Sequence, residues 1–402
     1  MTARPESSLR RGLEFAQSLA VLAAVLVACS PAATSRSTME VFWRARLDGA
    51  VDGTPAVANL RVFAGSAGGE VAAWDLATGS AVWNDRGLGA ISDSPAVLGG
   101  RVYVGTLAGH VLALDAADGA RLWDWAGPPN AAMWSSPVLY RDLVLIGIAS
   151  PYGDTPLVAG RVVALDAATG AERWNVCVRS GCPAGNGIWS TVSVDRAGVA
   201  FVGVGNPDDG VLAFDPLTGR HTWFHSLYPD QGRDLDVGAR PLILVSAGRE
   251  LVVEASVEGT LFALDAGNGD VVWSRRLVHG TAVHGLIASP ASDGINLYVA
   301  SASPPDGIFA IALADGSVVW HHDTSGPVYS APVLGGGAIV FGVGAVFGNL
   351  GAGSVVELAT DGRELSHFDT RSAVRAGPAV AGRFAIVGDY AGDLFVLSLS
   401  SS

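Results

Sequence analysis

Positive charge is scarce in this sequence. Its 402 residues include 25 Lys and Arg against 38 Asp and Glu, which gives a formal net charge of −13 at pH 7. No part of the chain carries a basic stripe, so binding to nucleic acid or to an anionic lipid surface is not expected.

Cysteine is also rare, with three residues in the whole chain. There is no pair of adjacent cysteines and no Cys-x-x-Cys-His segment of the kind that attaches haem. No Cys and His spacing resembles a zinc site, so no metal ligands are assigned. Cys177 and Cys182 lie close together in the sequence. They are expected to pair as a structural clip in an oxidising compartment.

The chain has little that could cross a membrane, because a spanning helix needs about 20 apolar residues. Residues 15–28 are mostly apolar but short, and they follow a cationic start. This pattern predicts an export signal over residues 1–28. Its end, Leu26-Val27-Ala28-Cys29, resembles a bacterial lipobox, which predicts a lipidated Cys29 as the first mature residue. An ordinary signal peptide is the alternative. The small, polar residues 29–40 are predicted to form a flexible tether.

The chain is rich in one repeated motif, Ala-x-Asp-x-x-x-Gly-x-x-x-Trp. Five copies end at Trp83, Trp123, Trp174, Trp223 and Trp273. A sixth copy, without the Asp, ends at Trp320. In each copy a strand with alternating apolar residues enters a tight turn made by Asp and Gly, and a second strand ends in Trp. A repeat of fixed period is typical of solenoids and propellers.

Two further strands precede each motif, so each unit is predicted to be a four-stranded antiparallel blade. A Pro opens the first strand of seven units, and Val192 takes its place in the remaining one; the seven are Pro55, Pro95, Pro137, Pro241, Pro290, Pro332 and Pro378. The sequence therefore predicts an all-β, eight-bladed β-propeller over residues 41–402. The last unit has only three strands. Residues 41–46, with Trp43 in phase with Trp83, are predicted to supply the fourth strand and close the ring.

Loop length distinguishes the two faces of the predicted ring. Turns between the first and second strands of a blade, and between the third and fourth, are mostly short. Longer loops fall on the opposite face, at residues 150–160, 175–187, 206–210, 225–236, 303–307 and 345–353. Because binding residues are commonly carried by loops on a rigid scaffold, this loop-rich face is the predicted functional surface.

One position on that face varies in residue type from blade to blade, whereas its neighbours are apolar before it and mostly small after it. The residue three before the opening Pro of each blade is expected at the mouth of the central channel. In ring order it is Asp52, Ser92, Trp134, Trp189, Gly238, Ile287, Tyr329 and Arg375. Asp236 and His284 lie nearby in the same strand starts. Aromatic rings, an acid and a guanidinium suit a planar, anionic or polyhydroxylated ligand. The alternative is that these side chains only fill the channel.

The repeat resembles the pyrroloquinoline-quinone (PQQ) propeller family over residues 41–399. The segments Gly187-Ile188-Trp189-Ser190, 202–206 and 234–239 are similar to quinoproteins of the polyvinyl-alcohol-dehydrogenase type. This resemblance implies PQQ stacked in the channel mouth, calcium beside it, and oxidation of an alcohol.

The same resemblance implies roles for individual residues. Trp134 or Trp189 would be the stacking platform, Arg375 would lie over the quinone oxygens, and Asp236 would be the base. His284 and Tyr329 are predicted to line the same mouth. An enzyme of this kind would need an external electron acceptor, because the chain has no haem segment.

An exported, lipid-anchored propeller is also similar in architecture to the propeller lipoprotein of the outer-membrane barrel-assembly machinery. That similarity implies a monomeric binding or scaffold protein of the cell envelope, attached to the membrane only through its lipid. Its ligand would be an envelope protein or a small polar molecule on the loop-rich face. We favour binding as the predicted function and keep PQQ-dependent alcohol oxidation as the alternative.

Overall fold

The computed structural model describes residues 37–229, 232–348 and 350–400. The predicted export signal, Cys29 and the first part of the predicted tether lie outside these ranges. Within them every regular element is a β-strand. The described part of the chain contains no helix long and apolar enough to cross a membrane.

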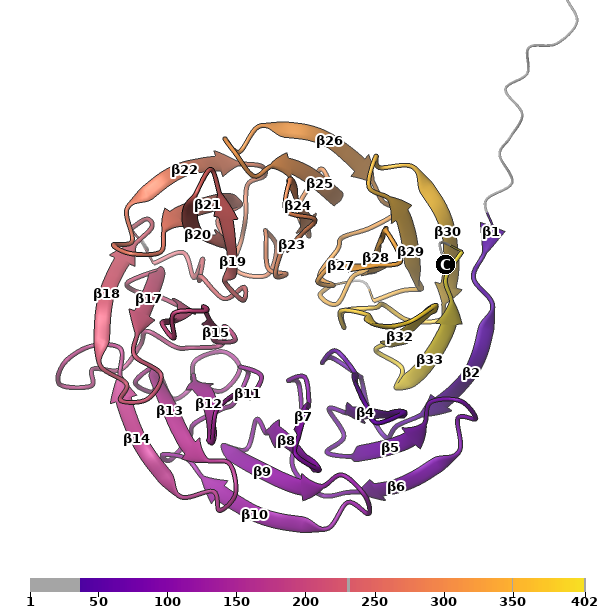
Figure 1. Cartoon of the computed structure of the whole chain (residues 1–402), viewed down its shortest axis with the longest axis horizontal. Helices are drawn as coiled ribbons and strands as arrows, with labels where there is room; N and C mark the ends of the chain where they lie inside the picture. The colour runs from indigo at the N-terminus through magenta and orange to yellow at the C-terminus, as the bar shows by residue number, and fades with distance from the viewer. Residues whose placement is uncertain (1–36, 230–231, 349, 401–402) are drawn as a thin grey trace, which may run out of the picture. The chain divides into compact units, whose positions relative to one another are not determined.

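The strands form eight sheets that follow one another around a ring in chain order (Figure 1). Six of the sheets have four antiparallel strands in simple sequence order, with the first strand nearest the axis and the last at the rim. The sheets of blades 7 and 8 each gain an outer strand from the N-terminal side. The eight-bladed β-propeller predicted from the repeat is therefore confirmed.

Blades 1 to 4 come first along the chain. Blade 1 contains β3 (Ala56–Ala58), β4 (Arg61–Gly65), β5 (Val71–Asp75) and β6 (Ala81–Asp85). Blade 2 contains β7 (Ala96–Leu98), β8 (Arg101–Gly105), β9 (His110–Asp115) and β10 (Arg121–Ala126). Blade 3 contains β11 (Val138–Tyr140), β12 (Leu143–Ile148), β13 (Arg161–Asp166) and β14 (Glu172–Cys177). Blade 4 contains β15 (Ser193–Val194), β16 (Ala200–Val204), β17 (Gly210–Phe214) and β18 (His221–Ser226).

Blades 5 to 8 complete the ring. Blade 5 contains β19 (Leu242–Ser246), β20 (Arg249–Ala255), β21 (Thr260–Asp265) and β22 (Val271–Arg276). Blade 6 contains β23 (Ala291–Ser292), β24 (Asn296–Ser301), β25 (Gly307–Ala312) and β26 (Val318–Asp323). Blade 7 contains β27 (Val333–Gly335), β28 (Ala338–Val343), β29 (Gly353–Ala359) and β30 (Glu364–Thr370). Blade 8 contains β31 (Ala379–Ala381), β32 (Phe384–Gly388), β33 (Asp393–Ser398) and, from the N-terminal side, β2 (Val41–Arg46).

The N-terminal part of the described chain contributes to two blades. Strand β2 pairs antiparallel with β33, which places Trp43 opposite Val396 at the rim of blade 8. Strand β1 (Ser37–Thr38) adds in parallel to the outer edge of β30. Met39 is buried in the apolar cluster between blades 7 and 8. Residues 37–40, which the sequence assigned to the tether, are therefore packed on the ring.

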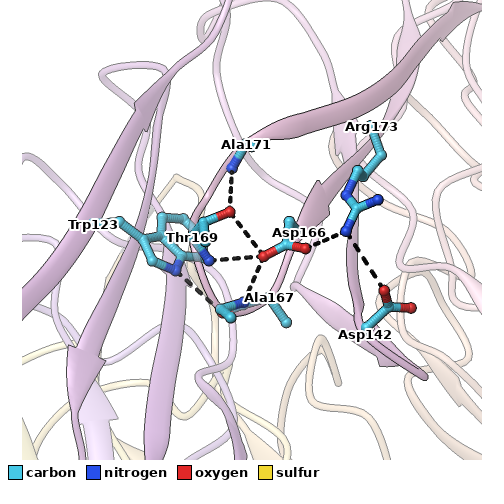
Figure 2. Close-up of polar contacts among 8 residues, drawn as sticks. Trp123, Asp142, Asp166, Ala167, Thr169, Ala171 and Arg173 are labelled. Atoms are coloured by element: carbon cyan, nitrogen blue, oxygen red, sulfur yellow. Dashed lines mark hydrogen bonds and ion pairs between the residues drawn. The ribbon is translucent and has the colours of Figure 1, made fainter.

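The Asp and Gly of the repeat make the turn between the third and fourth strands. Asp166 Oδ1 accepts hydrogen bonds from the backbone N–H of Thr169 (2.9 Å) and from its hydroxyl (2.8 Å), and its other oxygen binds Arg173 (Figure 2). Gly170 has a φ of 73°, in the left-handed region that favours glycine. A Cβ at Gly170 would lie 2.7 Å from the indole of Trp123 in the preceding blade. The turn is thus built to accept that ring.

The repeated Trp links each blade to the next. Its indole Nε1 donates to a turn carbonyl of the following blade at 2.8–3.1 Å in six pairs: Trp43–Leu76, Trp83–Ala116, Trp123–Ala167, Trp223–Ala266, Trp273–Leu313 and Trp320–Thr360. Trp174 packs in the same way, but its buried Nε1 has no hydrogen-bond partner among the described residues. In blade 7 Ser366 stands at the position of the Trp, paired with Glu357. Phe368, two residues further along β30, contacts Phe395 edge to face.

Cys177, the last residue of β14, is disulfide-bonded to Cys182. The two Cα atoms are 5.4 Å apart, within the usual range for a disulfide. The bond closes a short turn at the start of the long loop from blade 3 to blade 4, on the loop-rich face.

Candidate functional site

A cavity of about 400 Å³ lies at the mouth of the central channel on the loop-rich face. Six of the eight residues at the variable ring position line it: Ser92, Trp134, Trp189, Ile287, Tyr329 and Arg375. Asp236 is part of the same wall. The other two ring residues support their neighbours, since Gly238 packs under Trp189 and Asp52 lies beside Arg375. The volume is within the range typical of small-molecule sites.

Asp236 and Trp189 form the most constrained pair in the cavity. The Trp189 indole Nε1 donates to Asp236 Oδ2 at 2.7 Å, and the backbone N–H of Asn206 donates to Oδ1 at 2.8 Å. A Cβ at Gly238 would lie 1.9 Å from the Trp189 ring, so only glycine allows the indole to lie there. These contacts orient both side chains before any ligand binds.

The surroundings of Asp236 favour its neutral form more than usual. Burial raises the pKa of Asp236 to about 6, although the hydrogen bonds from Asn206 and Trp189 act in the opposite direction. The nearby carboxylates of Asp234 and Asp154 raise this pKa further. A carboxyl group with such a pKa can gain or lose a proton near neutral pH.

Tyr329 and His284 form a second pair, at the starts of blades 7 and 6, next to blade 5 in the ring. The Tyr329 hydroxyl donates to the carbonyl of Val283 at 2.9 Å, and His284 Nδ1 lies 2.7 Å from the same hydroxyl. His284 Nδ1 is also 3.0 Å from the carbonyl of Ala302. Burial raises the pKa of Tyr329, which therefore stays protonated. His284 is not part of the cavity wall but holds the ring of Tyr329 from behind.

Arg375 supplies the positive charge of the wall. Its Nη1 lies 3.9 Å from Asp52 Oδ2, a long ion pair, and its side chain is 27% exposed. Ser92 donates to the same Asp52 oxygen at 3.3 Å. The guanidinium is therefore held loosely and keeps donors available for a ligand.

Three further residues of the wall were not assigned a role from the sequence. Tyr152 and Phe347 come from the long loops of blades 3 and 7, where Tyr152 lies 6.5 Å from the ring of Trp134 and Phe347 lies edge to face with Tyr329. Asn206, in the long loop of blade 4, also donates from its amide to Asp234 at 2.9 Å. The sequence marked these loops by their length, but it did not show which of their side chains face the cavity.

The residues fit PQQ better than they fit calcium. Indole faces, a guanidinium and the cavity volume suit a planar acid. Asp234, Asp236 and Asn206 offer oxygen atoms of the type that Ca²⁺ prefers. Across the described ranges, however, no group of three or more His, Cys, Asp or Glu side chains is arranged to hold a metal ion. We therefore derive no step through calcium.

Comparison with known sequences identifies a family and enzyme relatives. Residues 32–206 and 207–358 match the PQQ_2 family model, described as outer membrane protein assembly factor BamB. A polyvinylalcohol dehydrogenase from Pseudomonas sp. is 25% identical over 273 residues, which covers 53% of this chain and 42% of that protein. The matched segment thus spans less than half the length of this relative.

Solved structures show the same architecture. The quinohemoprotein alcohol dehydrogenase from Comamonas testosteroni superposes with a TM-score of 0.77 and 18% identity, over 91% of this chain and 77% of the other. BamB from Moraxella catarrhalis gives a TM-score of 0.68 and 19% identity, over 91% and 99%. At such identities the likeness concerns the fold alone. The family model covers most of the chain, and the protein therefore belongs to the PQQ_2 family of β-propellers, described as outer membrane protein assembly factor BamB.

Proposed function

We propose that this protein is a binding propeller of the cell envelope whose channel mouth takes PQQ or a closely similar planar acid. One observation supports this most directly: Trp134, Trp189, Asp236 and Arg375, carried by four different blades, line one cavity. Indole rings provide stacking faces, and the guanidinium fork matches a carboxylate. A plug that only filled the channel would not need a cavity of about 400 Å³ there.

Binding is tested by titrating the mature protein with PQQ and following the quenching of tryptophan fluorescence. Arg375→Gln should weaken binding by at least about tenfold, because it removes the charge pair with the ligand. Arg371→Gln is the matched control, since Arg371 is exposed and lies outside the cavity wall. Absence of PQQ binding, or equal weakening by both variants, would contradict the proposal.

Attachment to the envelope is part of this proposal and rests on Leu26-Val27-Ala28-Cys29. Lipidation of Cys29 should place the protein in the membrane fraction as a processed form. Cys29→Ala should release it or leave an uncleaved precursor. A processed Cys29→Ala protein that still sediments with membranes would refute the anchor.

A second candidate function is alcohol oxidation, which the pKa of Asp236 favours. Bound PQQ would supply a two-electron acceptor for the carbon of an alcohol. Asp236, with its pKa raised to about 6, would accept the hydroxyl proton of the substrate. Trp189 and the Asn206 N–H would keep the carboxylate directed into the cavity.

Dye reduction separates the two functions. The PQQ-loaded protein is mixed with polyvinyl alcohol or a primary alcohol and an external redox dye. If the protein is an enzyme, Asp236→Asn should keep PQQ binding and lose dye reduction. Wild-type protein that binds PQQ and reduces no dye with any alcohol would leave binding as the function.

An envelope protein partner on the loop-rich face is also proposed, because the family is described as an assembly factor. The long loop 175–187 offers an exposed attachment point at Ser180. A photocrosslinking residue at Ser180 should capture the partner in cells. One at Asp118, exposed on a short turn of the opposite face, should not. The reverse result would assign the partner to the other face.

A further inference from the structure

Arg240 breaks a regular pattern in the inner wall of the channel. It stands directly before the opening Pro of blade 5, where the other blades have small residues: Thr54, Ser94, Ser136, Thr191, Ser289, Ala331 and Gly377. Where this position holds Ser or Thr, its hydroxyl can accept a hydrogen bond from the backbone N–H of the equivalent residue in the preceding blade. Three such bonds measure 2.9–3.1 Å: Thr54 N–H to Ser94, Ser94 N–H to Ser136 and Ser136 N–H to Thr191. Arg240 has no hydroxyl to offer and carries a long charged side chain instead.

The guanidinium of Arg240 has no carboxylate partner among the residues that the structure describes. Its Nε donates to Ser193 Oγ at 3.0 Å, and that hydroxyl itself donates to the carbonyl of Pro241. Arg240 is an exposed residue, although loss of solvation beside the channel wall lowers the pKa of its guanidinium. No acidic group of the described residues contributes to that pKa. The N–H groups of this guanidinium that Ser193 does not engage can pair with the carboxylate of a ligand.

Arg240 lines a second cavity, of about 370 Å³, which shares no residue with the cavity at the mouth. Its wall comes from the starts of the innermost strands of blades 4 to 7, farther along the channel from the loop-rich face. Two hydroxyl groups of this wall contact Arg240: Ser193 Oγ accepts from the guanidinium, and Ser289 Oγ accepts from the backbone N–H at 2.8 Å. The rest of the wall is apolar: Val194, Pro241, Leu242, Ile243, Pro290, Ala331 and Pro332.

We propose that this second cavity binds a small organic monocarboxylate with an apolar body. The guanidinium fork of Arg240 matches a carboxylate with two parallel hydrogen bonds. The proline and aliphatic wall would hold the hydrocarbon part. Because the cavity contains one positive group and no carboxylate, a single negative charge is the complement.

The proposal is tested by calorimetric titration of the whole mature protein with hexanoate. Hexanoate should bind at one site, and hexanol, which lacks the charge, should bind at least about tenfold more weakly. Arg240→Gln should weaken hexanoate binding by a similar factor, whereas Arg375→Gln at the channel mouth should leave it unchanged. Saturation with PQQ should not displace hexanoate, which separates this site from the proposed function.

Four results would overturn the inference. They are absence of hexanoate binding at millimolar concentration, equal binding of hexanol, unchanged binding by Arg240→Gln, and equally tight binding of inorganic phosphate. The comparison of hexanoate with hexanol and phosphate uses wild-type protein. It therefore decides the matter even if Arg240→Gln fails to fold.

Discussion

Replacing Glu254 with leucine should stabilise the propeller. Glu254 lies on β20, the second strand of blade 5, and its side chain is fully buried. The registers of the second and third strands place it in line with an apolar residue in each of the other blades: Ala64, Val104, Ile146, Val202, Val299, Phe341 and Val387. Blade 5 is thus the one blade with a charged residue type at this buried position.

The neighbour of Glu254 on its own face of β20 is apolar, and the residue paired with Glu254 across the sheet is Phe262. Val252, two residues earlier on the same face of β20, packs against Phe201 and Val211 of blade 4. Neither carboxyl oxygen of Glu254 has a hydrogen-bond partner of good geometry among the described residues. Burial raises the pKa of Glu254 well above its ordinary value of 4.5, and the adjacent N–H of Ala255 opposes this only in part.

Two costs follow from this position. An unpaired buried polar group destabilises the folded state by about 1–3 kcal/mol. Because the folded-state pKa of Glu254 is raised, the folded protein binds the proton more tightly than the unfolded chain. Its effect on stability is therefore constant below pH 4.5 and becomes unfavourable as pH rises from there toward the folded-state pKa. The slope is about 1.4 kcal/mol per pH unit.

Urea unfolding at pH 5 and pH 8 measures both costs. Glu254→Leu should be more stable than wild type by about 1–3 kcal/mol at pH 5 and by more at pH 8. Glu254→Gln should lose the pH-dependent part and keep the unpaired polar group. Val104→Glu, which places a carboxyl group at the equivalent site in blade 2, should destabilise. A Glu254→Leu protein that is less stable than wild type at both pH values would refute the reasoning.

Three further predictions concern the links between blades and the channel mouth. Trp123→Phe should cost about 1 kcal/mol more in thermal or urea unfolding than Trp174→Phe, because only Trp123 loses an indole hydrogen bond; equal costs would contradict this. Gly238→Ala should displace the Trp189 indole, which a Cβ would approach to 1.9 Å, and weaken PQQ binding at least about tenfold with little change in melting temperature; unchanged affinity would place the ligand elsewhere. Affinity for a planar acid should rise as pH falls through about 6, where Asp236 becomes neutral, and Asp236→Asn should abolish that dependence; a persisting dependence would assign it to another group.

The repeat alone determined the architecture. Trp, Asp and Gly recur at fixed spacing because each blade makes the same turn and presents the same ring to its neighbour, so blade number and strand order can be counted from the sequence. Aligning the repeats also identified the variable position three residues before each opening Pro. Strand alternation then placed Trp134, Trp189, Tyr329 and Arg375 at one level of the ring, and the cavity there contains all four.

Other features depended on contacts between distant parts of the chain. Residues 37–40 look like a tether in sequence, but the open edge of β30 and an apolar pocket for Met39 draw them onto blade 7. Tyr152 and Phe347 turn toward the cavity because of loop conformations that no short-range pattern specifies.

Tertiary structure also decided the chemistry of the site. Asp236 has a raised pKa only because the ring buries it beside Asp234 and Asp154, and only the fold brings the Trp189 indole to its carboxylate. His284 belongs behind Tyr329 rather than in the cavity wall. Local sequence determines turns and strand faces, because these depend on neighbours a few residues apart. Burial, charge environment and cavity shape depend on which blades meet, and that is settled only when the ring closes.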